Sequence, residues 1–254
     1  MGGPVAGRPG SESEAELESE SEAEPPVTDA VLLCGGRGTR LGGDVEKPLV
    51  EVGDRPMIGR VFDALAGSRI RRVVAVSSPY TPATTAAIEA GDVGPSPGND
   101  TKEPSAEWRG STGLACDLVV GDGDGYVDDL DRGLDAVDGP ALTVTSDLPL
   151  VRPRDVDDAI AAAVGSEDGD PGDLAADRTS IDSVAVCVPV SLKRELGASV
   201  DTSFIHDGLE VAPTGLNVVG GGDDTVVVRR SGTLAVNVNR PQDLELARRL
   251  ASEE

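Results

Sequence analysis

Apolar residues along the chain fall into short runs that alternate with longer stretches of helical spacing. The short runs predict buried strands at Asp29–Cys34, Arg72–Val76, Asp117–Val120, Ala141–Thr145, Ser183–Val188, Leu216–Val219 and Thr233–Val238. Helical spacing predicts helices at Pro56–Ala66, Pro82–Ala90, Val127–Val137, Arg154–Val164 and Pro241–Ala251. Strands separated by helices indicate βαβ units, so we expect an α/β fold with a mainly parallel central sheet.

Three segments interrupt this alternation. Residues 1–27 are acidic and of low complexity and end in two prolines, which predicts a disordered acidic tail. Residues 91–113 and 165–181 are rich in Gly, Pro and acidic residues and are expected to be flexible surface insertions. We therefore expect one domain over residues 28–254.

The charge balance narrows the possible partners. The chain has 46 acidic and 22 basic residues, a net charge of −24, and about −18 of this belongs to residues 29–254. Such a protein repels phosphate backbones and anionic lipid, so nucleic-acid and membrane-surface partners are not expected. No apolar run approaches the roughly 20 residues of a membrane span.

Composition also predicts where the protein works. Glutamates occupy residues 1–26, where a secretory signal would need basic and apolar stretches, and the three cysteines have no disulfide or metal spacing. Both features indicate a cytoplasmic protein. The body has few lysines and few aromatic residues, which resembles the proteins of salt-accumulating halophilic archaea, although an ordinary acidic protein from a biased genome would look similar.

A glycine-rich stretch directly after the first predicted strand carries the candidate chemistry. It reads Cys34-Gly35-Gly36-Arg37-Gly38-Thr39-Arg40, and Lys47-Pro48 follows shortly afterwards. Glycines let backbone N–H groups approach polyphosphate, and Arg40 and Lys47 add positive charge. The spacing matches neither a Walker A loop nor a dinucleotide fingerprint. A glycine-rich turn without a ligand is the structural alternative.

These residues resemble the signature of the nucleoside-triphosphate-transferase-like nucleotidyltransferases. The resemblance implies a Rossmann-like three-layer fold and transfer of a nucleoside monophosphate with release of pyrophosphate. It implies that Arg40 and Lys47 are catalytic. It further implies that the nucleotide is bound by Cys34, Gly35, Gly36, Arg37, Gly38, Thr39, Arg40 and Lys47.

A second block, Thr145-Ser146-Asp147-Leu148-Pro149, ends the fourth predicted strand. Ligands of open α/β sheets bind at the carboxyl ends of the strands, and Asp147 resembles the metal aspartate of the same family. We expect it to hold Mg²⁺, although a helix N-cap is the alternative. A second ligand is less clear, because the later segment Asn237-Val238-Asn239 offers amides rather than carboxylates.

Three further blocks lie at Ser77–Pro82, Gly123–Leu130 and Pro213–Val219. They resemble the archaeal adenosylcobinamide-phosphate guanylyltransferases of cobalamin biosynthesis. The resemblance implies that GTP and adenosylcobinamide phosphate are the substrates and that Asn217 lies on the acceptor side. The candidates for holding base and ribose are Ser77, Ser78, Pro79, Thr81, Gly123 and Gly125. Molybdenum cofactor guanylyltransferases, sugar-phosphate nucleotidyltransferases and a non-catalytic nucleotide-binding regulator remain alternatives, and a homodimer stays open.

Overall fold

The computed structural model describes residues 27–91, 93, 114–164 and 181–253. The predicted acidic tail and the two predicted insertions lie almost entirely outside these residues. Val27, at the end of the predicted tail, is fully buried in the core.

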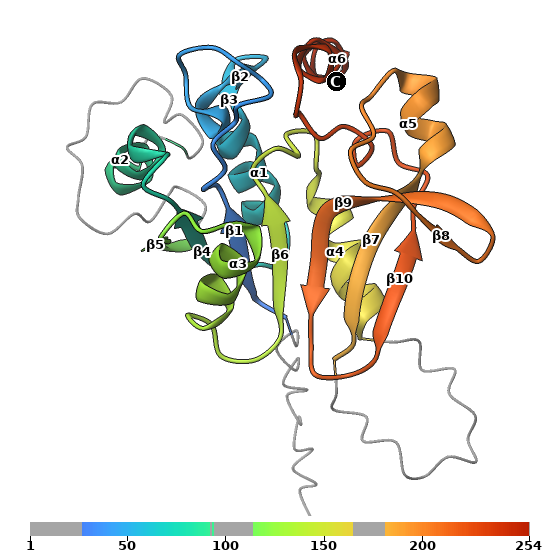
Figure 1. The fold of residues 1–254 in the computed structure, drawn as a ribbon. Coiled ribbons are helices and arrows are strands. Elements are labelled where there is room, and N and C mark those ends of the chain that lie inside the picture. The colour runs from blue at the N-terminus through green and yellow to red at the C-terminus, as the bar shows by residue number, and fades with distance from the viewer. Residues whose placement is uncertain (1–26, 92, 94–113, 165–180, 254) are drawn as a thin grey trace, which may run out of the picture.

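One eight-stranded mixed sheet forms the centre of the molecule (Figure 1). Its members are β1 (Asp29–Leu33), β4 (Arg72–Ser77), β5 (Ala115–Val120), β6 (Ala141–Thr145), β7 (Ser183–Pro189), β8 (Phe204–His206), β9 (Leu209–Val219) and β10 (Asp224–Val228). The strand order is β10-β7-β9-β6-β1-β4-β5, and β8 pairs with β9. All pairings are parallel except those of β9, which runs antiparallel to β6, β7 and β8. The expectation of a mainly parallel sheet is confirmed.

The described helices lie on the two faces of the sheet and above its upper edge (Figure 1). They are α1 (Met57–Ala66), α2 (Pro82–Ala90), α3 (Tyr126–Leu134), α4 (Pro153–Ala163), α5 (Val190–Leu196) and α6 (Pro241–Ala251). A 3-10 turn, η1 (Lys47–Leu49), and a small hairpin of β2 (Glu51–Val52) and β3 (Arg55–Pro56) follow the glycine-rich loop.

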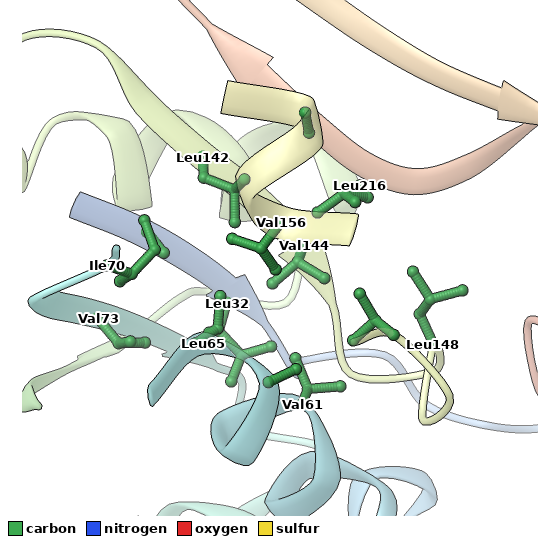
Figure 2. Close-up of a cluster of buried hydrophobic side chains, with 14 of the residues drawn as sticks. Leu32, Val61, Leu65, Ile70, Val73, Leu142, Val144, Leu148, Val156 and Leu216 are labelled. Atoms are coloured by element: carbon green, nitrogen blue, oxygen red, sulfur yellow. The ribbon is translucent and has the colours of Figure 1, made fainter. Parts of the chain in front are cut away.

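The alternation of side chains along β1 explains the three layers. Ala30 and Leu32 face a core shared with α1 and α4, whereas Val31 and Leu33 face a smaller cluster under α3. Figure 2 shows the larger core, to which β1 contributes Leu32, α1 contributes Leu65 and α4 contributes Val156. A third apolar cluster holds α6 against the hairpin and the glycine-rich loop.

One predicted strand is wrong. Residues 233–238 form a turn and an irregular extended segment instead of a strand. The apolar pattern is still satisfied, because Leu234, Ala235, Val236 and Val238 are all buried. The apolar pattern thus predicted burial correctly, but no described strand pairs with the backbone of these residues. Val238 N–H instead donates to the carbonyl of Asp147 at 2.8 Å.

The parallel strands β1, β4 and β6 share one carboxyl edge, and the candidate loops all leave from it. The glycine-rich loop follows β1, the Ser78–Thr81 turn follows β4, and Asp147 follows β6. This edge is where open α/β sheets bind ligands.

Candidate active site

The glycine-rich loop folds back on η1, and Gly38 permits the close approach. Its φ of +62° lies in the left-handed region, and a Cβ there would stand 2.7 Å from Cβ of Lys47. Gly38 is therefore needed for geometry. Its absence of a side chain lets the loop sit directly over the start of η1, where Lys47 leaves the backbone.

Lys47 is fixed from two sides. Its Nζ donates to Oδ2 of Asp147 at 2.8 Å and to Oδ1 of Asn239 at 2.7 Å. The side chains of Lys47 and Asp147 are only 14% and 18% exposed. A largely buried ammonium is thus held at the carboxyl edge of the sheet by residues from two other parts of the chain.

Asp147 stays ionised in this setting. Burial alone would raise its pKa, but the Lys47 charge and hydrogen bonds from Lys47, Thr145 and Asn237 outweigh burial and hold the pKa below its usual value. Thr145 Oγ1 donates to Oδ1 of Asp147 at 2.7 Å. The carboxylate is therefore oriented as well as charged.

A second lysine supports Asp147 indirectly, through Asn237. Lys193 of α5 is 3% exposed, and its Nζ donates to the carbonyl of Ala235 at 2.7 Å and to Oδ1 of Asn237 at 3.2 Å. Asn237 Nδ2 in turn donates to the carbonyl of Thr214 at 2.7 Å and faces Asp147 at 3.4 Å. Burial lowers the pKa of Lys193, although Asp243, Asp147 and Asp201 oppose the shift.

Beside this network lies a cavity of about 330 Å³, which we call the catalytic cavity because the predicted catalytic residue Lys47 lines it. Its lining comprises Leu33, Gly35, Gly36, Arg37, Lys47, Pro48, Tyr80, Gly123, Gly125, Tyr126, Asp129, Thr145, Ser146 and Asp147. The guanidinium of Arg37 lies 3.6 Å from the ring centroid of Tyr80. Glycine backbone, a lysine, two carboxylates and two aromatic rings thus meet in one place.

The structure brings together seven of the sixteen predicted site residues. Those that line the catalytic cavity are Gly35, Gly36, Arg37, Lys47, Gly123, Gly125 and Asp147. The others lie outside its lining: Cys34, Gly38, Thr39, Arg40, Ser77, Ser78, Pro79, Thr81 and Asn217.

Several of these outlying residues serve the loops themselves. Cys34 is buried and its Sγ contacts the carbonyl of Val76 at 3.0 Å. Ser78 Oγ donates to the carbonyl of Gly35 at 2.6 Å, and Thr81 Oγ1 accepts from the Ser78 backbone N–H. These side chains fix the glycine-rich loop against the turn after β4 and leave Tyr80 to face the cavity.

Two further predicted residues point elsewhere. Arg40 is 64% exposed and pairs with Asp201 at 2.9 Å. Asn217 on β9 lies in a different cavity, on the face of the sheet that α3 partly covers, with Nδ2 3.4 Å from Oγ1 of Thr143.

The sequence reasoning missed four residues of the site. Tyr80 lies between the predicted residues Pro79 and Thr81, while Tyr126 and Asp129 follow the Gly123–Gly125 loop. Lys193 could have been suspected, because it is one of only three lysines in the chain. Asp129 is 8% exposed, and its Oδ1 has no hydrogen-bond partner among the described residues, which is unusual for a buried carboxylate.

Asp147 fits the minimal requirement for a magnesium ligand. Mg²⁺ is commonly held by one or two carboxylates, with substrate phosphates and waters completing its shell. Within the described ranges no group of three or more His, Cys, Asp or Glu side chains could hold a metal by itself. The substrate would therefore have to complete the shell, and Lys47 now lies where a cation would meet Oδ2.

Comparison with known proteins identifies the family. The family model described as the MobA-like NTP transferase domain matches residues 30–203, which include the glycine-rich loop, Lys47 and Asp147. The chain belongs to this family. It is a nucleotidyltransferase, as its sequence motifs predicted.

Individual relatives agree with the MobA-like assignment. An adenosylcobinamide-phosphate guanylyltransferase from Methanocaldococcus jannaschii is 28% identical over 87% of this chain and 96% of its own length. A 2-C-methyl-D-erythritol 4-phosphate cytidylyltransferase from Frankia casuarinae is 32% identical, but over 55% of this chain and 44% of its own.

Solved structures support the fold. A putative glucose-1-phosphate thymidylyltransferase from Bacillus anthracis superposes with a TM-score of 0.61 at 14% identity, covering 89% of this chain and 96% of that one. A hypothetical transferase from Thermus thermophilus gives a TM-score of 0.54 at 16% identity, covering 86% and 99%. The expected Rossmann-like fold is confirmed. None of the helices in the described ranges has the length and apolarity needed to cross a membrane.

Proposed function

We propose that this MobA-like enzyme transfers GMP from GTP to adenosylcobinamide phosphate, giving adenosylcobinamide-GDP and pyrophosphate in cobalamin biosynthesis. The guanylyltransferase from Methanocaldococcus jannaschii supports this choice, because the match spans nearly all of both chains. The observation that carries the chemistry is the fixed Lys47 ammonium beside Asp147 at the rim of a glycine-lined cavity.

The reaction needs no protein nucleophile. A terminal phosphate oxygen of the acceptor attacks the α-phosphorus of GTP in line, a new P–O bond forms, and the bond from the α-phosphorus to the bridging oxygen breaks. The attacking phosphate is largely dianionic at neutral pH, because its second pKa is near 6. The task of the protein is to hold two anions together and to stabilise the charge that develops between them.

Lys47 and the loop backbone supply that stabilisation in our proposal. Lys47 lies within the lining of the catalytic cavity, where Asp147 and Asn239 position its ammonium before the nucleotide and Mg²⁺ bind. The backbone of Gly35 and Gly36 lines the same cavity and can approach the phosphates closely. Arg37, stacked on Tyr80 at the rim, adds a second positive charge. Arg40 would contribute only by leaving Asp201.

We assign Mg²⁺ to Asp147, with Asn239 as a neighbouring oxygen ligand. When bound, Mg²⁺ would neutralise phosphate charge and polarise the α-phosphoryl group. Thr145 and Asn237 orient the carboxylate toward the cavity through their hydrogen bonds to Oδ1.

The base is placed at the Tyr80 and Tyr126 end of the cavity. Aromatic faces stack on bases, and both rings are about half exposed, at 42% and 50%. Guanine presents two donors, N1–H and N2–H₂, which need an acceptor. The carboxylate of Asp129 lines this cavity and has acceptor capacity that no described residue uses, so we propose it as the guanine reader.

The deciding experiment offers the full-length protein adenosylcobinamide phosphate with GTP, ATP, CTP or UTP in turn, with Mg²⁺ at high salt. We expect pyrophosphate release with GTP alone. Cobinamide that lacks the phosphate is the matched control and should support no release. Release with CTP and methylerythritol phosphate, or with GTP and no corrinoid, would overturn the proposal.

We propose the cellular location of the enzyme from its composition and its cysteines. The three cysteines are free thiols, and burial raises the pKa of Cys116 to about 12 and of Cys187 to about 11, so they are unreactive at neutral pH. Unreactive thiols together with an acidic, lysine-poor chain support a salt-adapted cytoplasm. We also propose that residues 28–254 act as one domain.

A further inference from the structure

A second and larger cavity lies apart from the catalytic cavity. Its volume is about 560 Å³, within the range of small-molecule sites. It is bounded by the start of α4, the end of β10, the segment 229–234 and the end of α6. No residue lines both cavities. We call this second space the arginine cavity.

Four arginines line it, two from each of two segments. Arg152 and Arg154 flank the start of α4, and Arg229 and Arg230 follow β10. Arg154, Arg229 and Arg230 form no side-chain hydrogen bond or ion pair with any residue that the structure describes. Elsewhere in this acidic protein arginines such as Arg72 are paired with aspartates. Three guanidinium groups without a partner among the described residues thus gather in one cavity of a chain whose net charge is −24.

The acidic residues of the cavity do not neutralise the positive charge of its arginines. Asp155 is buried, and its Oδ2 accepts the Arg152 backbone N–H at 3.0 Å and the Thr233 hydroxyl at 3.2 Å. Its carboxylate is thus engaged in starting α4. Asp158 and Glu253 are exposed to solvent. Four cations against three carboxylates leave the lining net positive.

Apart from Ser231, Gly232 and Thr233, the rest of the lining is apolar. Leu150 and Leu234 are 2% exposed, as is Val186 of β7, and Leu196, Val227 and Leu250 complete the set. An arginine presents a planar fork of donors that matches a phosphate or carboxylate, while the aliphatic side chains favour an apolar body. The lining therefore suits a molecule that has both an anionic group and an apolar body.

We propose that the arginine cavity binds a small organic anion, with a phosphate or carboxylate group on the arginines and an apolar body against the aliphatic side chains. The site is separate from the catalytic cavity, with which it shares no lining residue.

Anilinonaphthalene sulfonate, an anionic aromatic dye, is a suitable probe, and calorimetric titration of the full-length protein gives its stoichiometry and affinity. We expect one bound dye per chain. The double variant Arg229→Gln/Arg230→Gln should weaken binding by about 10-fold or more, since it removes two charge-assisted contacts. Both side chains are exposed, so the fold should be retained, and circular dichroism checks this.

The matched control is Arg71→Gln/Arg249→Gln. It removes the same two charges from exposed arginines outside the cavity and should leave the affinity unchanged. Lys47→Met/Asp147→Asn, which alters the catalytic cavity and leaves no unpaired charge, should also leave the affinity unchanged. Equal weakening in both arginine double variants, or loss of binding in Lys47→Met/Asp147→Asn, would overturn the proposal.

Displacement of the dye tests the chemistry of the ligand. Naphthyl phosphate and naphthoate should displace it, because each joins an anion to an apolar body, and their relative strength distinguishes a phosphate ligand from a carboxylate ligand. Naphthol lacks the anionic group, and inorganic phosphate lacks the apolar body. Each should therefore bind at least about 10-fold more weakly than naphthyl phosphate. Displacement by naphthol as strong as by naphthyl phosphate would show that the arginines are not used and would refute the site.

Discussion

At the scale of single residues, Lys47 is the group on which the proposed chemistry depends most. Lys47→Ala should lower pyrophosphate release by about 100-fold or more, the usual effect of removing one fixed donor from a developing charge. It would also leave the half-buried Asp147 without its cation, which costs about 3–5 kcal/mol when such a pair is broken. Activity and stability must therefore be measured together.

The double variant Lys47→Met/Asp147→Asn separates the two effects, because it leaves no unpaired charge. We expect it to unfold at nearly the denaturant concentration of the wild type and to remain inactive. Turnover within about threefold of wild type in Lys47→Ala would contradict the proposed role, given the size of the expected loss.

Asp147 gives a prediction about pH. Its pKa in the folded protein lies below the usual value of about 3.9, so the pair stabilises the fold above that pH and loses its effect as the pH falls through the folded pKa. The difference in unfolding free energy between wild type and Asp147→Asn should be constant near neutrality and shrink below about pH 4. Urea denaturation over a pH series measures this difference. A difference that persists unchanged to about pH 2 would argue against the pairing.

Asp129 gives a prediction about base choice. Asp129→Asn replaces one acceptor oxygen by a donor, so the kcat/KM for GTP should fall by about 10-fold or more, while that for ATP should not fall. The assay compares both nucleotides at saturating acceptor. A loss of equal size for both would assign Asp129 to the support of the loops rather than to the base.

The sequence revealed those site residues whose motif is local. The glycines and Asp147 follow two strand ends directly, and Lys47 comes shortly after the glycines, so their place at the sheet edge could be predicted. Ser78 and Tyr80 are neighbours in one turn, and the pattern does not show which of them faces inward. Asp129 and Lys193 reach the site only through the packing of α3 and α5, which no short-range spacing encodes.

At the scale of elements, burial was easier to predict than pairing. The runs at β1, β4 and β6 were recognised because strands buried on both faces are continuously apolar. The same signal failed at residues 233–238, which are buried but unpaired. The direction of β9 was also invisible, since apolar patterning is identical for parallel and antiparallel strands. The short strand β10 and helix α5 were not predicted at all.

Gly215 links an element to the site and carries its own prediction. It lies in β9 with φ +82°, and a Cβ there would stand 2.4 Å from Oγ1 of Thr145, the hydroxyl that orients Asp147. Gly215→Ala should therefore reduce turnover as well as stability. Gly197→Ala is the matched control: its φ is +79° but its surroundings are open, so it should cost only the backbone strain of about 1–2 kcal/mol. Equal turnover in the two variants would show that Thr145 does not transmit the change.

At the scale of the whole molecule, the sheet divides into two parts that are each continuous in sequence. The first part holds β1, β4, β5 and β6, and the second holds β7, β8, β9 and β10. They meet along one antiparallel seam, where Ala141–Val144 of β6 pair with Leu216–Val219 of β9. The catalytic network lies at one end of this seam, and its members come from both parts.

Lys47 and Asp147 belong to the first part, whereas Lys193, Asn237 and Asn239 belong to the second. Two fragments separated between residues 172 and 173 should therefore be inactive alone and recover pyrophosphate release when they are produced together. Co-purification and assay of the pair measure this recovery. Turnover by the first fragment alone would show that the second part is not needed for catalysis.

The same seam connects ligand binding to folding. A nucleotide that recognises only the joined halves adds its binding free energy to their association, by RT ln(1 + [L]/Kd). GTP should then act as a folding cofactor that raises the affinity of one half of the chain for the other. In a protein whose like charges repel, the substrate would help to assemble the enzyme that consumes it.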